Sequence, residues 1–338
     1  MTTQRHPHDP RFALRVVVAF AALYTIWGST YLALQKAGAE VPPFLMAGAR
    51  FLAAGSILLT LCRLFGKLHP GDLSFRNWRA AVLVGFGLML VGNGGVAYAV
   101  QRLPTGISAV IVAITPMWLV LFDWAQRRKG RPSNAVFLGL ALGIAGVATL
   151  RLAGSSSEKA IDAVGLVVNI VGTIGWAAGS IFSRTAPKAA SPVTACAMQM
   201  LVGGALLIVA SSLMESWSSI DLSALTWRFW TSWSYLVVFG SLCGFTAYIW
   251  LLQHVSAAKV ATYAYVNPLV ALALGAWLNQ ERFTLTQMLA CGLILAGVVV
   301  LTVFRSRAAK PAAASDDRAK APETTDDRSE VIAARAGK

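Results

Sequence analysis

One arginine in this 338-residue chain is a candidate for binding chemistry, because it places a formal charge deep inside an apolar run. Arg50 lies within the run 43–62, seven residues from its start. At 1.5 Å per helical residue, this is about 10 Å below the end of a helix. A guanidinium at the centre of a membrane helix costs roughly 2.5–3.5 kcal/mol on insertion scales, so it should face protein or water. Arg50 is expected either to attract an anion such as a substrate carboxylate, or to act as a structural pin on helix-end carbonyls.

Uncharged amide side chains on apolar runs form a second group of candidates. Asn93 lies among glycines, Asn267 directly precedes a proline, and Gln199 matches Arg50 in a sequence repeat described below. Such side chains can bind a substrate, or they can simply tie helices together at about 0.6 kcal/mol each.

Aromatic side chains on the same runs could line a cavity for flat or amphipathic cargo, although aromatics also fill cores and interfacial belts. With the polar candidates, they give a predicted substrate cavity of Trp27, Tyr31, Arg50, Asn93, Tyr98, Trp176, Gln199, Tyr248, Tyr263, Tyr265 and Asn267.

Two prolines interrupt apolar runs about ten residues past a turn. Pro116 and Pro268 each lack a backbone donor and clash with the carbonyl four residues earlier, so each should kink its helix. The kinks are expected either to act as hinges that shape the cavity or to be ordinary bends of membrane helices.

Signals for catalysis are missing. The sequence has no intramembrane cluster of His, Asp and Glu, no HExxH or Gly-x-Ser-x-Gly motif, and no Walker motif. Its four cysteines are scattered without CxxC spacing. The sequence therefore predicts no catalytic residue, no metal site, no cofactor and no ATP-driven pump.

The elements that must position these residues are membrane helices. With 56% hydrophobic and 13% charged residues, the chain differs from an average soluble domain, and its charges cluster between long apolar runs. Each of these runs has about the 17–25 residues that a helix needs to cross a bilayer, and lipid offers the backbone no hydrogen-bond partner outside a helix. The predicted fold class is an all-α membrane protein. Its ten transmembrane helices are expected at 13–34, 43–62, 80–101, 104–123, 134–150, 163–183, 192–213, 230–252, 257–278 and 284–304.

The net charge of +14 follows the loops and does not indicate nucleic acid. On alternate segments that include both tails, 22 Lys and Arg residues are found, against 6 on the other segments. The positive-inside rule therefore predicts a multi-pass protein of the inner (plasma) membrane with both termini in the cytoplasm.

The two halves of the chain repeat one pattern. Without a gap, residues 92–116 match 244–268, which sets Pro116 on Pro268. Further matches are Trp27 with Trp176 and Arg50 with Gln199. Because five helices per half is an odd number, the second half must insert upside down relative to the first. The predicted parts are a cytoplasmic tail (1–12), a first repeat (13–151), a periplasmic connecting loop (152–162), a second repeat (163–304) and a disordered cytoplasmic tail (305–338).

Four segments carry a family resemblance. WGSTYLAL, MAGARFLAAG, GNGGVAYAVQRLPTGISAVIVAITPMW and PLVALALGAWLNQERFT, in this order, resemble the drug/metabolite transporter superfamily. More narrowly, they resemble its EamA-type ten-helix exporters and the YedA-like inner-membrane members. The resemblance implies a basket of helices around a central cavity, alternating access, and export of small metabolites such as amino acids or related compounds, with drugs as further cargo. Related members often carry a glutamate where this chain has Val100, so no proton-carrying role transfers to that position.

The prediction is therefore a secondary exporter whose partners are a small-molecule substrate and the lipid bilayer. A passive channel, or a non-transport membrane protein that acts as an enzyme or as a partner in a complex, is the alternative. The sequence leaves open the cargo, any coupling to protons or ions, and the oligomeric state.

Overall fold

The computed structural model describes residues 10–125, 134–153, 161–187, 189, 191–218, 220–221, 223–255 and 257–308. Every regular element within these residues is a helix, which confirms the predicted all-α class. The first half contains α1 (Pro10–Gly38), α2 (Pro43–Leu64), α3 (Phe75–Gly85), the π-helix η1 (Phe86–Gly94), α4 (Gly95–Ala99), α5 (Thr105–Val112), α6 (Thr115–Ala125) and α7 (Asn134–Ala153). The second half contains α8 (Ala163–Thr185), α9 (Pro192–Met214), α10 (Trp227–Tyr235), the π-helix η2 (Leu236–Cys243), α11 (Gly244–His254), α12 (Ala257–Val260), α13 (Tyr263–Leu278) and α14 (Leu285–Ala308).

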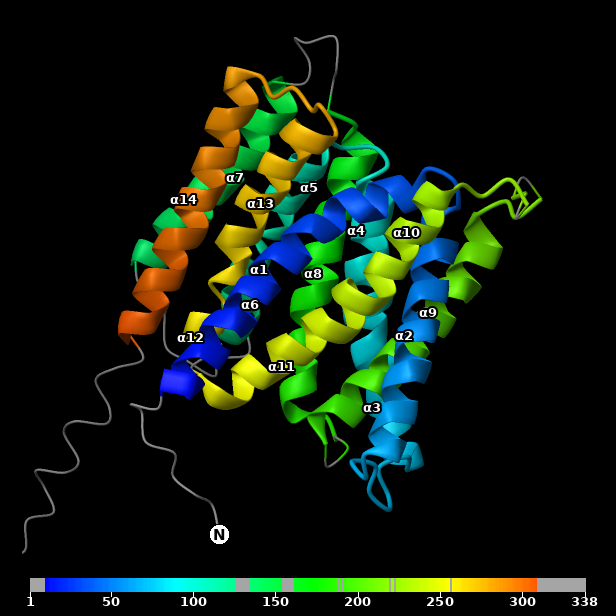
Figure 1. Cartoon of the computed structure of the whole chain (residues 1–338). Helices are drawn as coiled ribbons and strands as arrows, with labels where there is room; N and C mark the ends of the chain where they lie inside the picture. The colour runs from blue at the N-terminus through cyan, green and yellow to red at the C-terminus, as the bar shows by residue number, and fades with distance from the viewer. Residues whose placement is uncertain are drawn as a thin grey trace, which may run out of the picture.

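The same order of elements occurs twice. Each half has two long helices, a helix with a π-helical segment in its middle, a broken helix and a last helix. In Figure 1, α1 runs up the bundle and α8 runs down it, and the pairs α2/α9 and α7/α14 are likewise opposed. The start of α1 and the end of α14 lie at the same, lower end of the bundle. The arrangement is consistent with the predicted inverted repeat.

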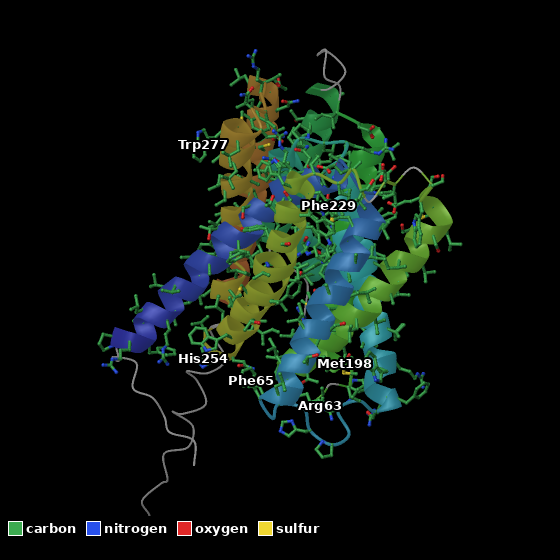
Figure 2. The ribbon with its side chains drawn as sticks, turned by 45° about the vertical axis from the view of Figure 1, so that its right-hand side comes forward. Arg63, Phe65, Met198, Phe229, His254 and Trp277 are labelled. Carbon is green, nitrogen blue, oxygen red and sulfur yellow. The ribbon has the colours of Figure 1, made fainter. Side chains whose placement is uncertain are left out.

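Seven of the described helical segments are long and apolar enough to cross a membrane. Val136–Leu150, Tyr263–Leu278 and Leu285–Leu301 are shorter apolar helices, so a crossing by each of these three remains a prediction. Large apolar side chains point away from the bundle, as Trp277 on α13 does with 77% of its surface exposed (Figure 2). Such an exposed apolar surface is suited to contact with lipid.

The predicted parts agree only partly with the described helices at their edges. Helix α1 begins at Pro10, inside the predicted N-terminal tail, and α14 continues to Ala308, inside the predicted C-terminal tail. Residues 1–9, 154–160 and 309–338, which make up most of the two tails and of the connecting loop, lie outside the described residues.

Two pairs of equivalent helices pack closely through glycine, α7 with α14 and α2 with α9. A Cβ at Gly297 would lie 2.6 Å from the carbonyl oxygen of Gly139, and a Cβ at Gly139 would lie 2.8 Å from that of Gly297. A Cβ at Gly204 would lie 2.8 Å from the backbone nitrogen of Leu52. Small residues let membrane helices approach this closely. The pair α2/α9 also contributes residues to the wall of the cavity described next.

Candidate functional site

A cavity of about 690 Å³ lies between the two halves of the chain. Its wall includes residues of α1, α2, η1 and α5–α6 from the first half, and of α8, α9, α11 and α13 from the second. It extends to Asn77 at the start of α3 and to Arg184 at the end of α8. We call the end of the bundle that holds Pro10, Arg184 and Ala308 the terminal end, and the opposite end, which holds Glu40, Glu215 and Glu281, the carboxylate end.

The structure brings most of the sequence candidates to this one wall. The residues of the predicted cavity that line it are Trp27, Tyr31, Arg50, Asn93, Trp176, Gln199, Tyr248, Tyr263 and Asn267, together with Pro116 and Pro268. Two candidates lie elsewhere: Tyr98 stacks on Phe44 with Arg102 above its ring at 4.8 Å, and Tyr265 packs against a separate apolar cluster. Contact with a substrate remains a prediction for all of them.

Four rings form one side of the wall, and we call Trp27, Phe245, Tyr248 and Tyr263 the aromatic cluster. The indole of Trp27 lies 5.3 Å from the rings of Phe245 and Tyr263 and 5.4 Å from that of Tyr248, between ring centroids. Tilted and edge-to-face contacts at this spacing stabilise aromatic groups beyond their burial. The cluster gives the cavity an apolar wall of ring faces and ring edges beside its polar groups.

Arg50 is buried, with 3% of its surface exposed, and it is held by the π-helix η2. Its Nε donates to Oγ of Ser241 at 2.9 Å, and a Cβ at Gly240 would lie 3.0 Å from its Nη2. No ion pair of Arg50 is present within the described residues. The cavity wall, as far as the structure describes it, contains neither aspartate nor glutamate. The guanidinium therefore brings a positive charge to the cavity without a carboxylate beside it.

Asn267 and Asn93 differ in how their amides are used. Oδ1 of Asn267 is buried and has no hydrogen-bond partner among the residues that the structure describes. The next residue, Pro268, cannot donate to the carbonyl of Ala264. Nδ2 of Asn93 donates to the carbonyl of Leu88 at 3.0 Å. This bond spans five residues, as π-helical bonds do, so Asn93 supports η1 as well as lining the cavity.

Each half has one broken helix, but with residues 92–116 set on 244–268 the break of the second half comes four residues earlier, so the two prolines lie differently relative to their breaks. Helix α5 ends at Val112 and α6 begins at Thr115, so Pro116 lies in the first turn after a break. Pro268 lies inside α13, and the corresponding break comes before Tyr263. A hinge at these positions remains a prediction.

The carboxylate end is closed by glutamates of the second half that bind helix N-termini of the first half. Oε1 of Glu281 accepts from the backbone N–H and the hydroxyl of Thr105, both at 2.9 Å, and Oε2 accepts from the N–H of Gly106 at 3.4 Å. Glu215 accepts from the N–H groups of Phe44 at 2.9 Å and Leu45 at 3.0 Å. The first N–H groups of a helix lack intrahelical partners and favour negative charge, so both carboxylates are well placed.

Amide side chains add to this closure between α1 and the segment before α5. Nε2 of Gln101 donates to the carbonyl of Leu34, and Nε2 of Gln35 donates to that of Val100, each at 3.0 Å. The two bonds form a reciprocal pair across the carboxylate end of the cavity.

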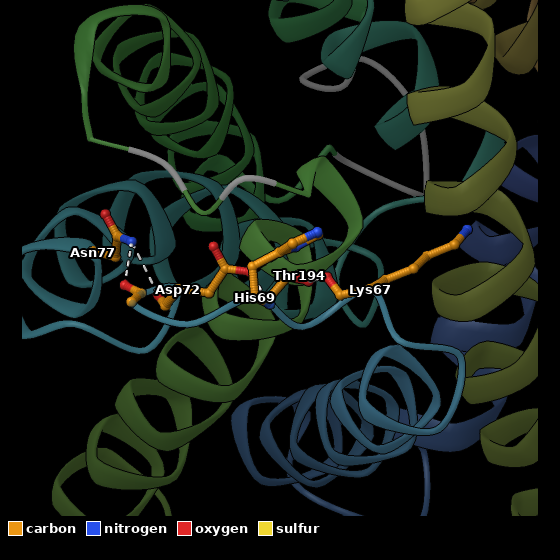
Figure 3. Close-up of polar contacts among 6 residues, drawn as sticks. Lys67, His69, Asp72, Asn77 and Thr194 are labelled. Atoms are coloured by element: carbon orange, nitrogen blue, oxygen red, sulfur yellow. Dashed lines mark hydrogen bonds and ion pairs between the residues drawn. The ribbon is translucent and has the colours of Figure 1, made fainter.

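At the terminal end, polar contacts fasten a loop beside the cavity (Figure 3). Nδ2 of Asn77 donates to the carbonyl of Asp72 at 3.0 Å, and Oγ1 of Thr194 on α9 donates to the carbonyl of Lys67 at 3.2 Å. These bonds fix the loop between α2 and α3. They leave Asn77 and the exposed Arg184 on the cavity wall.

Sequence reasoning missed several wall residues, and one pattern could have found three of them. Thr173, Ser180 and Arg184 recur, together with the predicted Trp176, every three or four residues along α8 and line the cavity. Polar residues at helical spacing on an apolar run indicate a face turned away from lipid. Ser241, the partner of Arg50, has no such local signal.

Comparison with known proteins gives consistent similarities. The model of the EamA-like transporter family matches residues 14–152 and 163–303. The uncharacterized inner membrane transporter YedA of Escherichia coli K12 is 38% identical over 290 residues, which cover 84% of this chain and 90% of that protein. A probable amino-acid metabolite efflux pump of Salmonella typhimurium LT2 is 27% identical over 320 residues, covering 91% and 98%. One solved crystal structure resembles the fold with a TM-score of 0.59 at 21% identity, covering 87% of this chain and 99% of that one.

Proposed function

This chain belongs to the EamA-like transporter family and is a membrane transporter, and we propose that it exports small metabolites across the inner membrane by alternating access. The observation that carries the proposal is a cavity between two oppositely running halves, closed at the carboxylate end and extending to the terminal end. A site at the interface of inverted repeats can be exposed to either side by a rocking of one half against the other.

The structure corresponds, in this proposal, to the state that loads cargo from the cytoplasm. The positive-inside rule assigns the terminal end to the cytoplasm, and Arg63 lies at that end beside Phe65 (Figure 2). The proposal thereby keeps the repeats at 13–151 and 163–304, with the loop 152–162 in the periplasm and both termini in the cytoplasm.

Amino acids or related compounds are the cargo that we propose. A relative in Salmonella typhimurium is named a probable amino-acid metabolite efflux pump. The cavity wall of this chain combines a guanidinium, amides and aromatic rings, which suits a small amphipathic molecule.

Saturable export by the purified full chain in proteoliposomes tests the proposal. A panel of amino acids and analogues should include at least one compound whose flux saturates with concentration, while empty liposomes show none. Trp277→Ala, on the outer face of α13, is the matched control and should keep the flux. Imposed proton and sodium gradients separate coupled from uncoupled export. Flux that never saturates would favour a channel, and no flux of any compound would contradict a transporter of this cargo.

A further inference from the structure

We propose that the cavity binds a cargo that carries a carboxylate, held by Arg50, and a flat apolar body, held by the aromatic cluster. The inference rests on the proposed transport function and narrows its cargo. It also assigns Arg50 a role in specificity, which the sequence left open between anion binding and a structural pin.

The charge balance of the wall calls for an anion. Arg50 is 3% exposed, and the wall that it lines carries no Asp or Glu among the described lining residues. A buried charge is costly unless it is paired and hydrogen-bonded. An anionic group on the cargo would supply the missing partner, whereas a cationic cargo would add to the cost.

The local geometry leaves the guanidinium ready for a bidentate contact. Nε of Arg50 donates to Oγ of Ser241 at 2.9 Å, and Cζ of Arg50 lies 4.7 Å from the ring centroid of Phe51. These two contacts fix the plane of the group, and within the described residues no hydrogen bond takes its two terminal nitrogens. Planar carboxylates bind such a pair of N–H groups with two parallel bonds.

Gly240 connects this charge to the aromatic cluster. Its carbonyl accepts from Nε1 of Trp27 at 3.2 Å, while a Cβ on Gly240 would lie 3.0 Å from Nη2 of Arg50. The first ring of the cluster and the guanidinium therefore approach the same residue of η2. A cargo that reaches both needs its carboxylate close to its flat apolar part.

The other half of the chain lacks these features. The position that matches Arg50 is Gln199, and the offset that sets residues 92–116 on 244–268 places Leu88 and Met89 opposite Gly240 and Ser241. The two repeats thus offer two equivalent positions for a charged side chain, Arg50 and Gln199, but only the first of them holds a positive charge. A substrate site that differs between the halves is expected where an asymmetric molecule must bind in one orientation.

Equilibrium binding to the full chain in lipid nanodiscs tests the inference. The probes are 3-phenylpropionate and 3-phenylpropionamide, which share their shape but differ in the carboxylate. The acid should bind roughly tenfold or more tightly than the amide, since hydrogen bonds to charged groups carry this difference. Arg50→Gln should abolish the preference, Arg50→Lys should keep part of it, and Trp277→Ala, on the outer face of α13, should leave it unchanged.

The outcomes separate the inference from the transport function. The inference is overturned if the unaltered chain binds acid and amide equally, or if it does not bind the acid at millimolar concentration. It is also overturned if the Arg50→Gln protein melts at a lower temperature yet keeps the preference for the acid. If Arg50→Gln does not fold, the Arg50→Lys and Ser241→Ala proteins decide: a preference that neither changes contradicts the inference. A carboxylate preference that depends on Arg50, in a protein that exports nothing, would support the site and contradict the transporter.

Discussion

The two ends of the bundle are made from the same repeated fold but are held in different ways. At the carboxylate end, Glu281 and Glu215 reach from the second half to helix N-termini of the first, and Glu40 reaches from the first half to Thr226 at 2.8 Å. At the terminal end, the bond from Thr194 to Lys67 is a neutral one, and the cavity continues to Arg184. Charge-assisted bonds are stronger than neutral ones. Carboxylates therefore join the two halves at one end of the bundle, and each of them can be removed separately to test whether it holds that end closed.

Removal of Glu281 should weaken the carboxylate end more than any other change, and so reduce the difference between the two ends most strongly. Glu281→Ala leaves three donors of Thr105 and Gly106 without their acceptor. At roughly 1.5–3 kcal/mol for a hydrogen bond to a charged group, hydrogen exchange at the start of α5 should accelerate by roughly ten- to a hundredfold. Mass spectrometry of the protein in nanodiscs measures this rate.

The matched control for this variant is Asp221→Asn. Asp221 lies in a loop of the same end and binds the neighbouring Ser223, not the other half of the chain. The Asp221→Asn variant should leave hydrogen exchange at α5 unchanged. Equal protection of α5 with and without Glu281 would show that the carboxylate does not hold this end closed.

A glycine pair away from both ends should change stability without changing which end is closed. Gly297→Ala places a methyl group 2.6 Å from the backbone oxygen of Gly139, which cannot move like a flexible side chain. Overpacking of this kind costs roughly 1–3 kcal/mol. The melting temperature should fall, while exchange at α5 stays the same.

Gly292 on the same helix provides the control, because a Cβ there would meet no described atom within 4 Å. Gly292→Ala should melt like the unaltered chain. If both alanine variants behave alike, close contact between α7 and α14 is not what stabilises this pair.

Much of the fold could be predicted because membrane helices are encoded locally. The ten apolar runs coincide with described helices or helix groups to within a few residues, since hydrophobic length and loop charge are properties of adjacent residues. Trp27 and Trp176 could be placed through the repeat. In the structure they pack against Gly244 and Gly92, which also match one another.

Contacts that join distant residues could not be predicted in this way. Ser241 lies 191 residues from Arg50, and Thr105 lies 176 residues from Glu281. Tyr98 faces Phe44 instead of the cavity, and it follows the π-helix η1, whose wider turns shift the face that later residues present. Propensity and spacing carry no signal for such a shift.

A smaller change at the carboxylate end separates the hydroxyl of Thr105 from the backbone N–H groups that also donate to Glu281. Thr105→Val removes the hydroxyl that donates to Glu281 but keeps the backbone donors of Thr105 and Gly106. The loss should be roughly 0.5–1.5 kcal/mol, so exchange at α5 should rise only a few-fold. An effect as large as that of Glu281→Ala would mean that the hydroxyl, and not the helix N-terminus, provides the closure.

The smallest expected effect is a pH dependence through Glu40. Hydrogen bonds from Thr226 hold the pKa of this carboxyl below its usual value. Its contribution to stability is therefore complete above the ordinary glutamate pKa and is lost as the pH falls through the lowered value. Thermal melting between neutral and acidic pH should show a slight loss that Glu40→Gln removes. A slope that persists in Glu40→Gln would assign the effect to another group.

Accessibility of the cavity from each side of the membrane tests the account most directly. In a chain whose four cysteines are replaced, Thr30→Cys places one thiol on the cavity wall for an impermeant maleimide. The account predicts labelling from the cytoplasmic side alone in the resting protein, and a shift toward periplasmic labelling when Glu281 is changed to Ala. Equal labelling from both sides of the resting protein, or none from either side in any variant, would contradict a cavity that opens to one side at a time.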